Sequence, residues 1–156
     1  MDFIQIVAIN NTFFNCWSLR EITSPAGVTS FGDFAFIHCS DVQSIDIESN
    51  NLNSASIDEI LFTKNLEEIL CFPAKHHFSS YQIPANVASI AHFSFCECSN
   101  LQSITIPTSV RSIDDSAFFN CRNLQTISIF HLFQSRIPQA FNYQNNFPKF
   151  PLIRKY

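Results

Sequence analysis

A repeat of 23 residues is the feature that most constrains how this chain folds. Residues 27–47, 86–106 and 109–129 align without a gap on the pattern V-x-S-[FI]-x-x-x-[AS]-F-x-x-C-x-x-[LV]-Q-[ST]-I-x-I, and residues 13–22 carry a partial copy. Most of the repeated letters are apolar, and a unit of this size cannot bury its own apolar face. We therefore predict that the copies stack into a solenoid in which each coil covers the next.

Equivalent side chains of stacked coils form ladders along the solenoid axis. The pattern predicts a phenylalanine ladder (Phe36, Phe95, Phe118), a cysteine ladder (Cys16, Cys39, Cys98, Cys121) and an aliphatic ladder (Leu19, Val42, Leu101, Leu124). Residues 43–47, 102–106 and 125–129 alternate polar and apolar side chains, which is typical of a strand with one buried face. Stacked in parallel, these strands are expected to form a continuous β ribbon.

Two complete units, residues 83–105 and 106–128, resemble the repeat of the BspA-like leucine-rich repeat family, surface antigens of bacteria and anaerobic protists. The stretch between Cys39 and Cys98 is 59 residues, which is no multiple of 23, but it follows a longer module of that family. The matching residues are Glu48-Ser49-Asn50-Asn51, Ile57-Asp58-Glu59-Ile60-Leu61-Phe62, Lys64, Leu66, Ile69, Pro73, Lys75 and Tyr81-Gln82-Ile83-Pro84. Glu59 stands where the family commonly has glycine, so the turn before Leu61 is expected to be built differently.

The resemblance covers about residues 13–129. It implies a right-handed leucine-rich repeat coil with a parallel β ribbon, short strands and short helical turns, in about five coils that include the longer module. We predict a degenerate N-terminal cap over residues 1–12, the solenoid over 13–129 with the longer module at 48–84, and a divergent C-terminal cap or loosely ordered tail over 130–156. Whether the chain is a fragment of a longer product is left open.

Composition argues for one folded, mildly acidic domain. Charged residues make up 14% and apolar residues 46% of the chain, and the net charge is −4, so neither disorder nor a nucleic-acid-binding surface is favoured. We interpret the 18 phenylalanines as packing inside the coils rather than as platforms for stacked bases. No stretch is long enough to span a membrane, and Asp2 occupies the region where a signal peptide carries positive charge.

No metal or cofactor is predicted. The ladder cysteines are expected to pack as small hydrophobic side chains. Cys96 and Cys98 with His92 lack a second pair at ligand spacing. His76-His77 is interpreted as a solvated turn.

No enzymatic activity is predicted either. The chain has two glycines, so it has no glycine-rich phosphate loop, and it has no G-x-S-x-G or H-E-x-x-H motif. The paired carboxylates Asp114-Asp115 and Glu67-Glu68 are interpreted as a helix cap and as residues that flank a strand.

The outer face of the ribbon is the candidate binding surface. If Ile45, Ile104 and Ile127 point inward, their neighbours on the strands point outward. Repeat solenoids bind proteins through such rigid, extended surfaces. The predicted ribbon residues are Glu21, Thr23, Ser44, Asp46, Glu68, Leu70, Ser103, Thr105, Thr126 and Ser128.

Two functions compete at this point. The resemblance implies a cell-surface or secreted antigen that adheres to a host matrix or cell-surface protein, and the sequon Asn10-Asn11-Thr12 gives export weak support. Such proteins usually carry an export signal or a membrane anchor, and neither is predicted from these residues. The alternative is therefore an intracellular scaffold, or a truncated family copy that has retained no partner. The ligand and the oligomeric state are not specified by the sequence.

Overall fold

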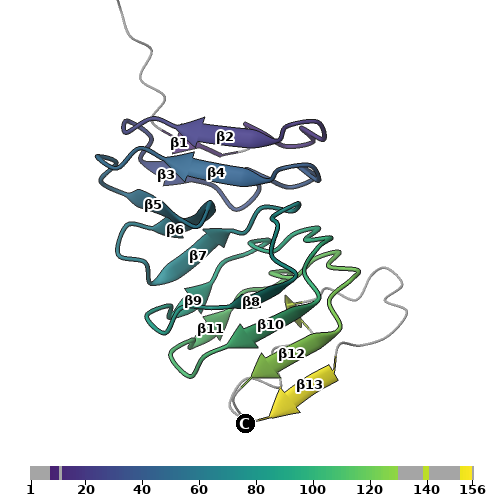
Figure 1. The fold of residues 1–156 in the computed structure, drawn as a ribbon. Coiled ribbons are helices and arrows are strands. Elements are labelled where there is room, and N and C mark those ends of the chain that lie inside the picture. The colour runs from purple at the N-terminus through teal and green to yellow at the C-terminus, as the bar shows by residue number, and fades with distance from the viewer. Residues whose placement is uncertain (1–7, 11, 130–138, 141–151, 156) are drawn as a thin grey trace, which may run out of the picture.

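The computed structural model describes residues 8–10, 12–129, 139–140 and 152–155. Over these residues the chain is a β-solenoid of about five turns with parallel strands and almost no helix (Figure 1). The predicted repeat solenoid is confirmed. Residues 1–7 and 11 of the predicted N-terminal cap, and most of the predicted C-terminal cap or tail at 130–156, lie outside the described residues. Those boundaries stay predictions.

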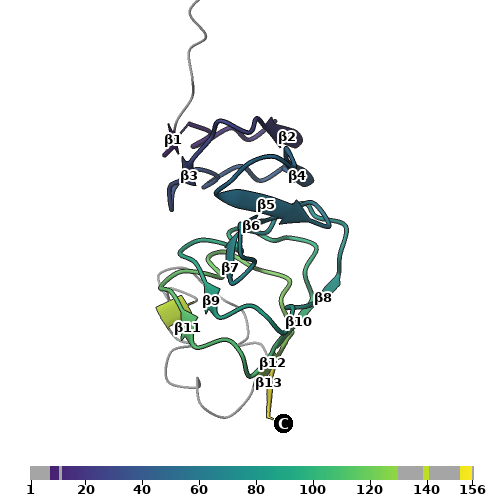
Figure 2. The same ribbon diagram turned by 90° about the vertical axis from the view of Figure 1, so that its left-hand side faces the viewer.

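Longer strands follow one side of the coil and two-residue strands follow the other (Figure 2). On the first side, β2 (Glu21–Ser24) pairs with β4 (Ser44–Ile47), and a second sheet has the order β13 (Leu152–Lys155), β12 (Thr126–Ile129), β10 (Ser103–Ile106), β8 (Ser80–Gln82). On the other side, β1 (Ala8–Ile9) pairs with β3 (Ser30–Phe31), and β9 (Ser89–Ile90) with β11 (Ser112–Ile113). The strands β3, β9 and β11 lie where the V-x-S-[FI] part of the repeat recurs.

The strands pair in the register that the repeat predicts. Ile104 lies opposite Ile127, and Ile22 opposite Ile45. Ser80 lies opposite Ser103, which is 23 residues further along the chain. The coil register therefore extends back to β8, where Tyr81 takes the inward position that Ile104 holds in β10.

A β-hairpin interrupts the coils. β5 (Ser54–Ile57) and β6 (Ile60–Thr63) pair antiparallel, and β7 (Glu68–Cys71) adds to β6. On its other edge β7 pairs in parallel with β9, which gives the sheet order β11-β9-β7-β6-β5. The hairpin thus carries the chain to the second side of the solenoid, and the first side is divided into two sheets rather than one continuous ribbon.

The core contains the predicted ladders, and the phenylalanine ladder has two additional members, Phe13 and Phe72. The rings of Phe72, Phe95 and Phe118 stack with centroids 5.0 Å apart at each step, and Phe13 stacks on Phe36 at 5.7 Å. Phe72, Phe95 and Phe118 are all fully buried. Aromatic pairs in this geometry add stability beyond the area that they bury.

The ladder cysteines are packing residues with a hydrogen bond of their own. Cys39 Sγ donates to the Phe13 carbonyl at 2.8 Å, and Cys121 Sγ to the Phe95 carbonyl at 2.7 Å. All six cysteines of the chain lie in the described part and are free thiols. Burial raises the pKa of Cys39 to about 11, so this thiol stays protonated and unreactive at neutral pH.

Candidate binding surfaces

The N-terminal part of the predicted ribbon lies on β2 and β4. The register places Glu21 beside Ser44 and Thr23 beside Asp46, while Ile22 between them is buried. Glu21, Thr23 and Asp46 are exposed and Ser44 is half-buried. These four residues form a compact polar patch with two carboxylates, here called the acidic patch.

The C-terminal part of the predicted ribbon lies on β10 and β12, where Ser103 pairs with Thr126 and Thr105 with Ser128. Ser103, Thr105 and Thr126 are half-buried. Ser128 is 9% exposed, so its predicted outward position gives it little access to solvent. β13 pairs with β12 along its other edge, so β12 is an interior strand like β10.

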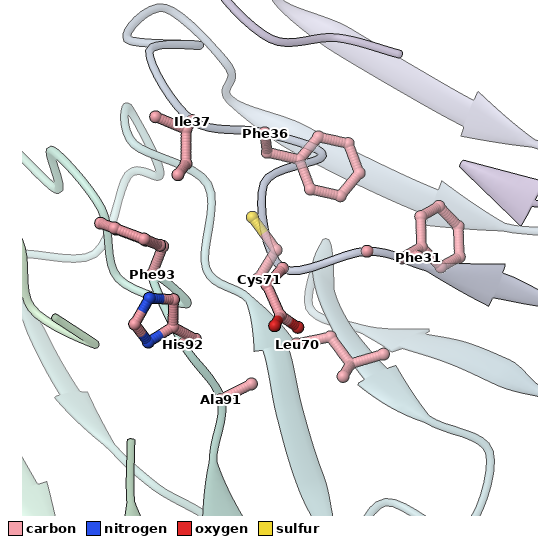
Figure 3. A pocket seen from close by; sticks show the side chains of 10 residues that line it. Phe31, Phe36, Ile37, Leu70, Cys71, Ala91, His92 and Phe93 are labelled. Carbon is pink, nitrogen blue, oxygen red and sulfur yellow. The ribbon is translucent and has the colours of Figure 1, made fainter. Parts of the chain in front are cut away.

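Glu68 and Leu70 do not lie on this face. Both belong to β7, which the hairpin places in the other sheet. Leu70 packs against the core and lines a cavity of about 20 Å³ with Cys71 and Phe93 (Figure 3). That volume is far below the roughly 300–1,000 Å³ of a ligand pocket, so the cavity is a packing space and not a binding site.

Ser80 and Gln82 occupy the ribbon positions that were expected of Glu68 and Leu70. Both are exposed on β8, and Ser103 and Ser80 share a hydrogen bond between their hydroxyls at 2.8 Å. Counting 23 residues back from Ser103 and Thr105 would have identified them. The signal was hidden because Lys75 stands at the ladder position of cysteine and Tyr81 at that of isoleucine.

A groove of about 480 Å³ is the second candidate surface, and it was not foreseen. Most of its lining residues come within two positions of a ladder cysteine, so we call it the cysteine-edge groove. The residues are Trp17, His38, Ser40, Asp41, Lys75, Glu97, Ser99, Asn120 and Arg122. The signal in the sequence is the polar character of the positions that flank the repeated cysteine.

Backbone geometry aims these side chains outward. The residue before each ladder cysteine is left-handed, with φ of 62° at Asn15, 59° at His38, 58° at Glu97 and 58° at Asn120. Asparagine tolerates this conformation well, whereas histidine and glutamate adopt it at a cost. The same turn therefore presents a polar side chain at the same place in successive coils.

Hydrogen bonds link the groove side chains across coils. His38 Nδ1 lies 2.9 Å from Glu97 Oε1, Asn120 Nδ2 donates to the same oxygen at 3.4 Å, and Arg122 Nε donates to Asn120 Oδ1 at 2.7 Å. Trp17, which also lines the groove, is 64% exposed. Tryptophan and arginine are the residue types enriched in protein-binding hot spots.

The two adjacent histidines differ from the predicted solvated turn. His76 is fully buried, with Nε2 2.8 Å from the Asp58 carbonyl oxygen and Nδ1 accepting the Phe78 backbone N–H at 3.3 Å. Burial lowers the pKa of His76, so the ring is neutral at neutral pH. His77 does extend to solvent, since its side chain is 69% exposed. The interpretation was wrong for His76, because the β5–β6 turn covers its ring, whereas the His77 ring stacks on the outer side of it with centroids 4.5 Å apart.

Of the paired carboxylates, Glu67 precedes β7 and Glu68 begins it, whereas Asp114 and Asp115 are followed by a turn and not by the helix that they were predicted to cap. Asp114 and Asp115 are both exposed at a turn after β11. Glu67 is exposed and accepts a hydrogen bond from Asn65 at 2.8 Å. Over the residues that the structure describes, no helix is long and apolar enough to cross a membrane.

Comparison with known proteins agrees with this architecture. The profile of the family described as BspA type leucine rich repeat region matches residues 5–74 and 68–155, with six copies. A comparison with curated proteins finds no significant match.

Three similar solved structures are bacterial repeat proteins. A leucine-rich repeat protein from Eubacterium ventriosum is 24% identical with a TM-score of 0.66, over 70% of this chain and 36% of that one, and shows the fold alone. The pneumococcal vaccine antigen PcpA is 26% identical with a TM-score of 0.68, over 73% of this chain and 30% of that one. A leucine rich cell surface protein from Faecalibacterium prausnitzii is 33% identical with a TM-score of 0.64, over 70% and 29%. The matched part thus spans about a third of each of these proteins.

Proposed function

The chain belongs to the BspA-type leucine-rich repeat family, and from this premise we propose that it is a non-enzymatic, protein-binding repeat protein of the surface-antigen type. Its role is adhesion to a host matrix or cell-surface protein, and its contact surface is the exposed side of the β ribbon. Two proteins of similar structure support this assignment, because one is a pneumococcal vaccine antigen and the other is a cell surface protein.

The observation that carries the proposal is the acidic patch. Glu21, Thr23 and Asp46 are exposed on two strands that are fixed to each other by a ladder of backbone hydrogen bonds. A partner that binds a preformed surface does not have to order it, so little of the interaction energy is lost. The charge of the patch favours a basic partner surface, which carboxylates attract over a distance of about 10 Å at moderate salt.

The cysteine-edge groove supports the same function through a different surface. It is open, spans several coils and combines Trp17 with Lys75 and Arg122. The groove and the patch lie on different parts of the coil, since one follows the cysteine turns and the other follows β2 and β4. Separate substitutions therefore distinguish which of them binds.

The test is binding of the whole chain to immobilised fibronectin, laminin and collagen, with three variants. Asp46→Lys reverses a charge in the acidic patch, Trp17→Ala removes the exposed ring of the groove, and Asp114→Lys is a matched charge reversal elsewhere. The proposal predicts that Asp46→Lys weakens binding by about tenfold or more, as loss of a central contact does, while Asp114→Lys has no effect.

Other outcomes assign the function differently. If only Trp17→Ala weakens binding, the contact surface is the cysteine-edge groove. Equal binding by all three variants would contradict the ribbon as the contact surface. No binding to any matrix protein would contradict the adhesive role and favour an intracellular scaffold or a family copy without a partner.

A further inference from the structure

Three side chains with metal-ligating atoms meet where the β5–β6 turn touches the loop after β7. Glu59 Oε2 lies 3.8 Å from His76 Nε2 and 3.9 Å from His77 Nδ1, and the three ligand atoms all lie within 4.8 Å of one another. Glu59 comes from the hairpin turn and the two histidines from the loop. The cluster therefore joins two segments that are 17 residues apart, counting from Glu59 to His76.

The cluster has a fixed inner side and an open outer side. The His76 side chain is 0% exposed, whereas Glu59 is 47% and His77 69% exposed. His76 is held by its two ring contacts, with the Asp58 carbonyl oxygen 2.8 Å from Nε2 and the Phe78 N–H on Nδ1. An ion can thus enter from solvent and meet a ligand whose direction is already set.

The turn that carries Glu59 is built at a cost. Asp58 and Glu59 have φ of 49° and 65°, as both central residues of a two-residue hairpin turn must. Asp-Gly is a preferred pair for such a turn, because glycine adopts positive φ without a steric penalty. Glu59 occupies the glycine position, and its carboxylate points at the two histidines. Strain of this kind is found at functional sites.

We propose that Glu59, His76 and His77 form a zinc site with one position open to solvent. Two imidazoles and one carboxylate are a donor set that zinc accepts, and three protein ligands with one open position is a known arrangement for this ion. Ligand atoms at 2.0–2.1 Å from a tetrahedral ion are about 3.3 Å from one another. The Glu59 carboxylate lies 3.8 and 3.9 Å from the two histidine nitrogens, which lie within 4.8 Å of each other, so zinc binding needs an inward movement of the exposed Glu59 and His77 side chains and a shift of the Asp58 carbonyl away from His76 Nε2.

Zinc binding at His76 requires a change of tautomer. The ring carries its proton on Nε2, which donates to the Asp58 carbonyl, while Nδ1 accepts the Phe78 N–H. As zinc takes the Nε2 lone pair, the Nε2 proton leaves to solvent, Nδ1 takes up a proton from solvent, both hydrogen bonds are given up, and the imidazole remains neutral. The carbonyl oxygen then faces the ion and helps to neutralise its charge.

The test uses the whole chain, freed of metal with EDTA and kept reduced, with zinc chloride as the probe and magnesium chloride as the comparison. Calorimetry is expected to show one zinc per chain, and zinc but not magnesium is expected to raise the melting temperature. His77→Ala is the main variant, because the exposed side chain contributes little to folding. It should weaken zinc binding by at least about tenfold, while His92→Ala, at a histidine outside the cluster, should bind as the wild type does.

Glu59→Gly distinguishes loss of zinc binding from loss of folding. It should raise the melting temperature in EDTA by relieving the backbone and should abolish the zinc-dependent shift. The proposal is overturned if His77→Ala and His92→Ala bind zinc alike, or if Glu59→Gly keeps the shift. A thiolate charge-transfer band with cobalt(II) would place the ion on a cysteine and would overturn it as well.

Discussion

Phe95 is the residue at which the stacking of the coils can be tested most sharply. Its ring is 0% exposed and lies between those of Phe72 and Phe118, with centroids 5.0 Å away on both sides. Replacing a buried phenylalanine with alanine costs about 3–5 kcal/mol, and each lost ring pair is worth about 0.5–1.5 kcal/mol within such a figure. Because Phe95 makes two pairs, we expect Phe95→Ala to lower the free energy of unfolding by about 4–5 kcal/mol.

The assay is urea unfolding followed by circular dichroism, with two companion variants. Phe95→Leu keeps most of the buried volume and loses mainly the ring pairs, so it should cost about 1–2 kcal/mol and gives a reading if Phe95→Ala does not fold. Phe14→Ala makes the same chemical change at a ring that is 46% exposed, and should cost less than about 1 kcal/mol. A cost for Phe95→Ala no larger than that for Phe14→Ala would refute the ladder as the basis of stability.

Three further changes test other parts of the structure. Ile104→Ala truncates a buried side chain and should lower the free energy of unfolding in urea by about 2–5 kcal/mol. Thr105→Ala, at a half-buried neighbour, should lower it by less than about 1 kcal/mol. The reverse order would show that the strand faces are wrongly assigned. Asn51→Ala should lower the free energy of unfolding by about 2–4 kcal/mol, because the buried amide donates to the Val28 carbonyl at 2.8 Å and accepts from two backbone N–H groups. A change near zero would contradict this role of Asn51. The pKa of His76 is lowered in the folded protein, so between the two pKa values the unfolded chain binds a proton at this ring that the folded chain does not. The contribution to stability is therefore full above about pH 6.5 and falls as the pH drops below that value. His76→Gln should flatten the dependence of stability on pH, and an unchanged slope would argue against this role of His76.

The repeat was sufficient to predict the coils because each apolar residue packs against its equivalent in the neighbouring coil, at a constant spacing in the sequence. Equal spacing of Ile22 and Ile45, and of Ile104 and Ile127, fixes both the parallel pairing and the buried face. The same spacing places the phenylalanine and cysteine ladders. The prediction of a continuous ribbon was less successful, because it assumed that the stretch between Cys39 and Cys98 keeps the course of the coil.

What the pattern could not specify are contacts between unlike segments. The hairpin of β5 and β6 places β7 in the second sheet, so Leu70 faces the core, although its alternation with Ile69 and Cys71 looks like that of a ribbon strand. His76 is buried because the β5–β6 turn supplies a carbonyl 18 residues earlier in the chain. No periodicity encodes such a contact, and the adjacent histidines look identical until the loop is folded.

The measurement that tests the proposed function most directly is staining of native cells with an antibody against this chain, before and after permeabilisation, with a cytoplasmic marker as the control for leakage. A surface adhesin has to present its ribbon outside the cell. We expect the antibody to stain intact cells that show no signal from the cytoplasmic marker. A signal that appears only after permeabilisation, together with the marker, would contradict it and would direct the search to intracellular partners.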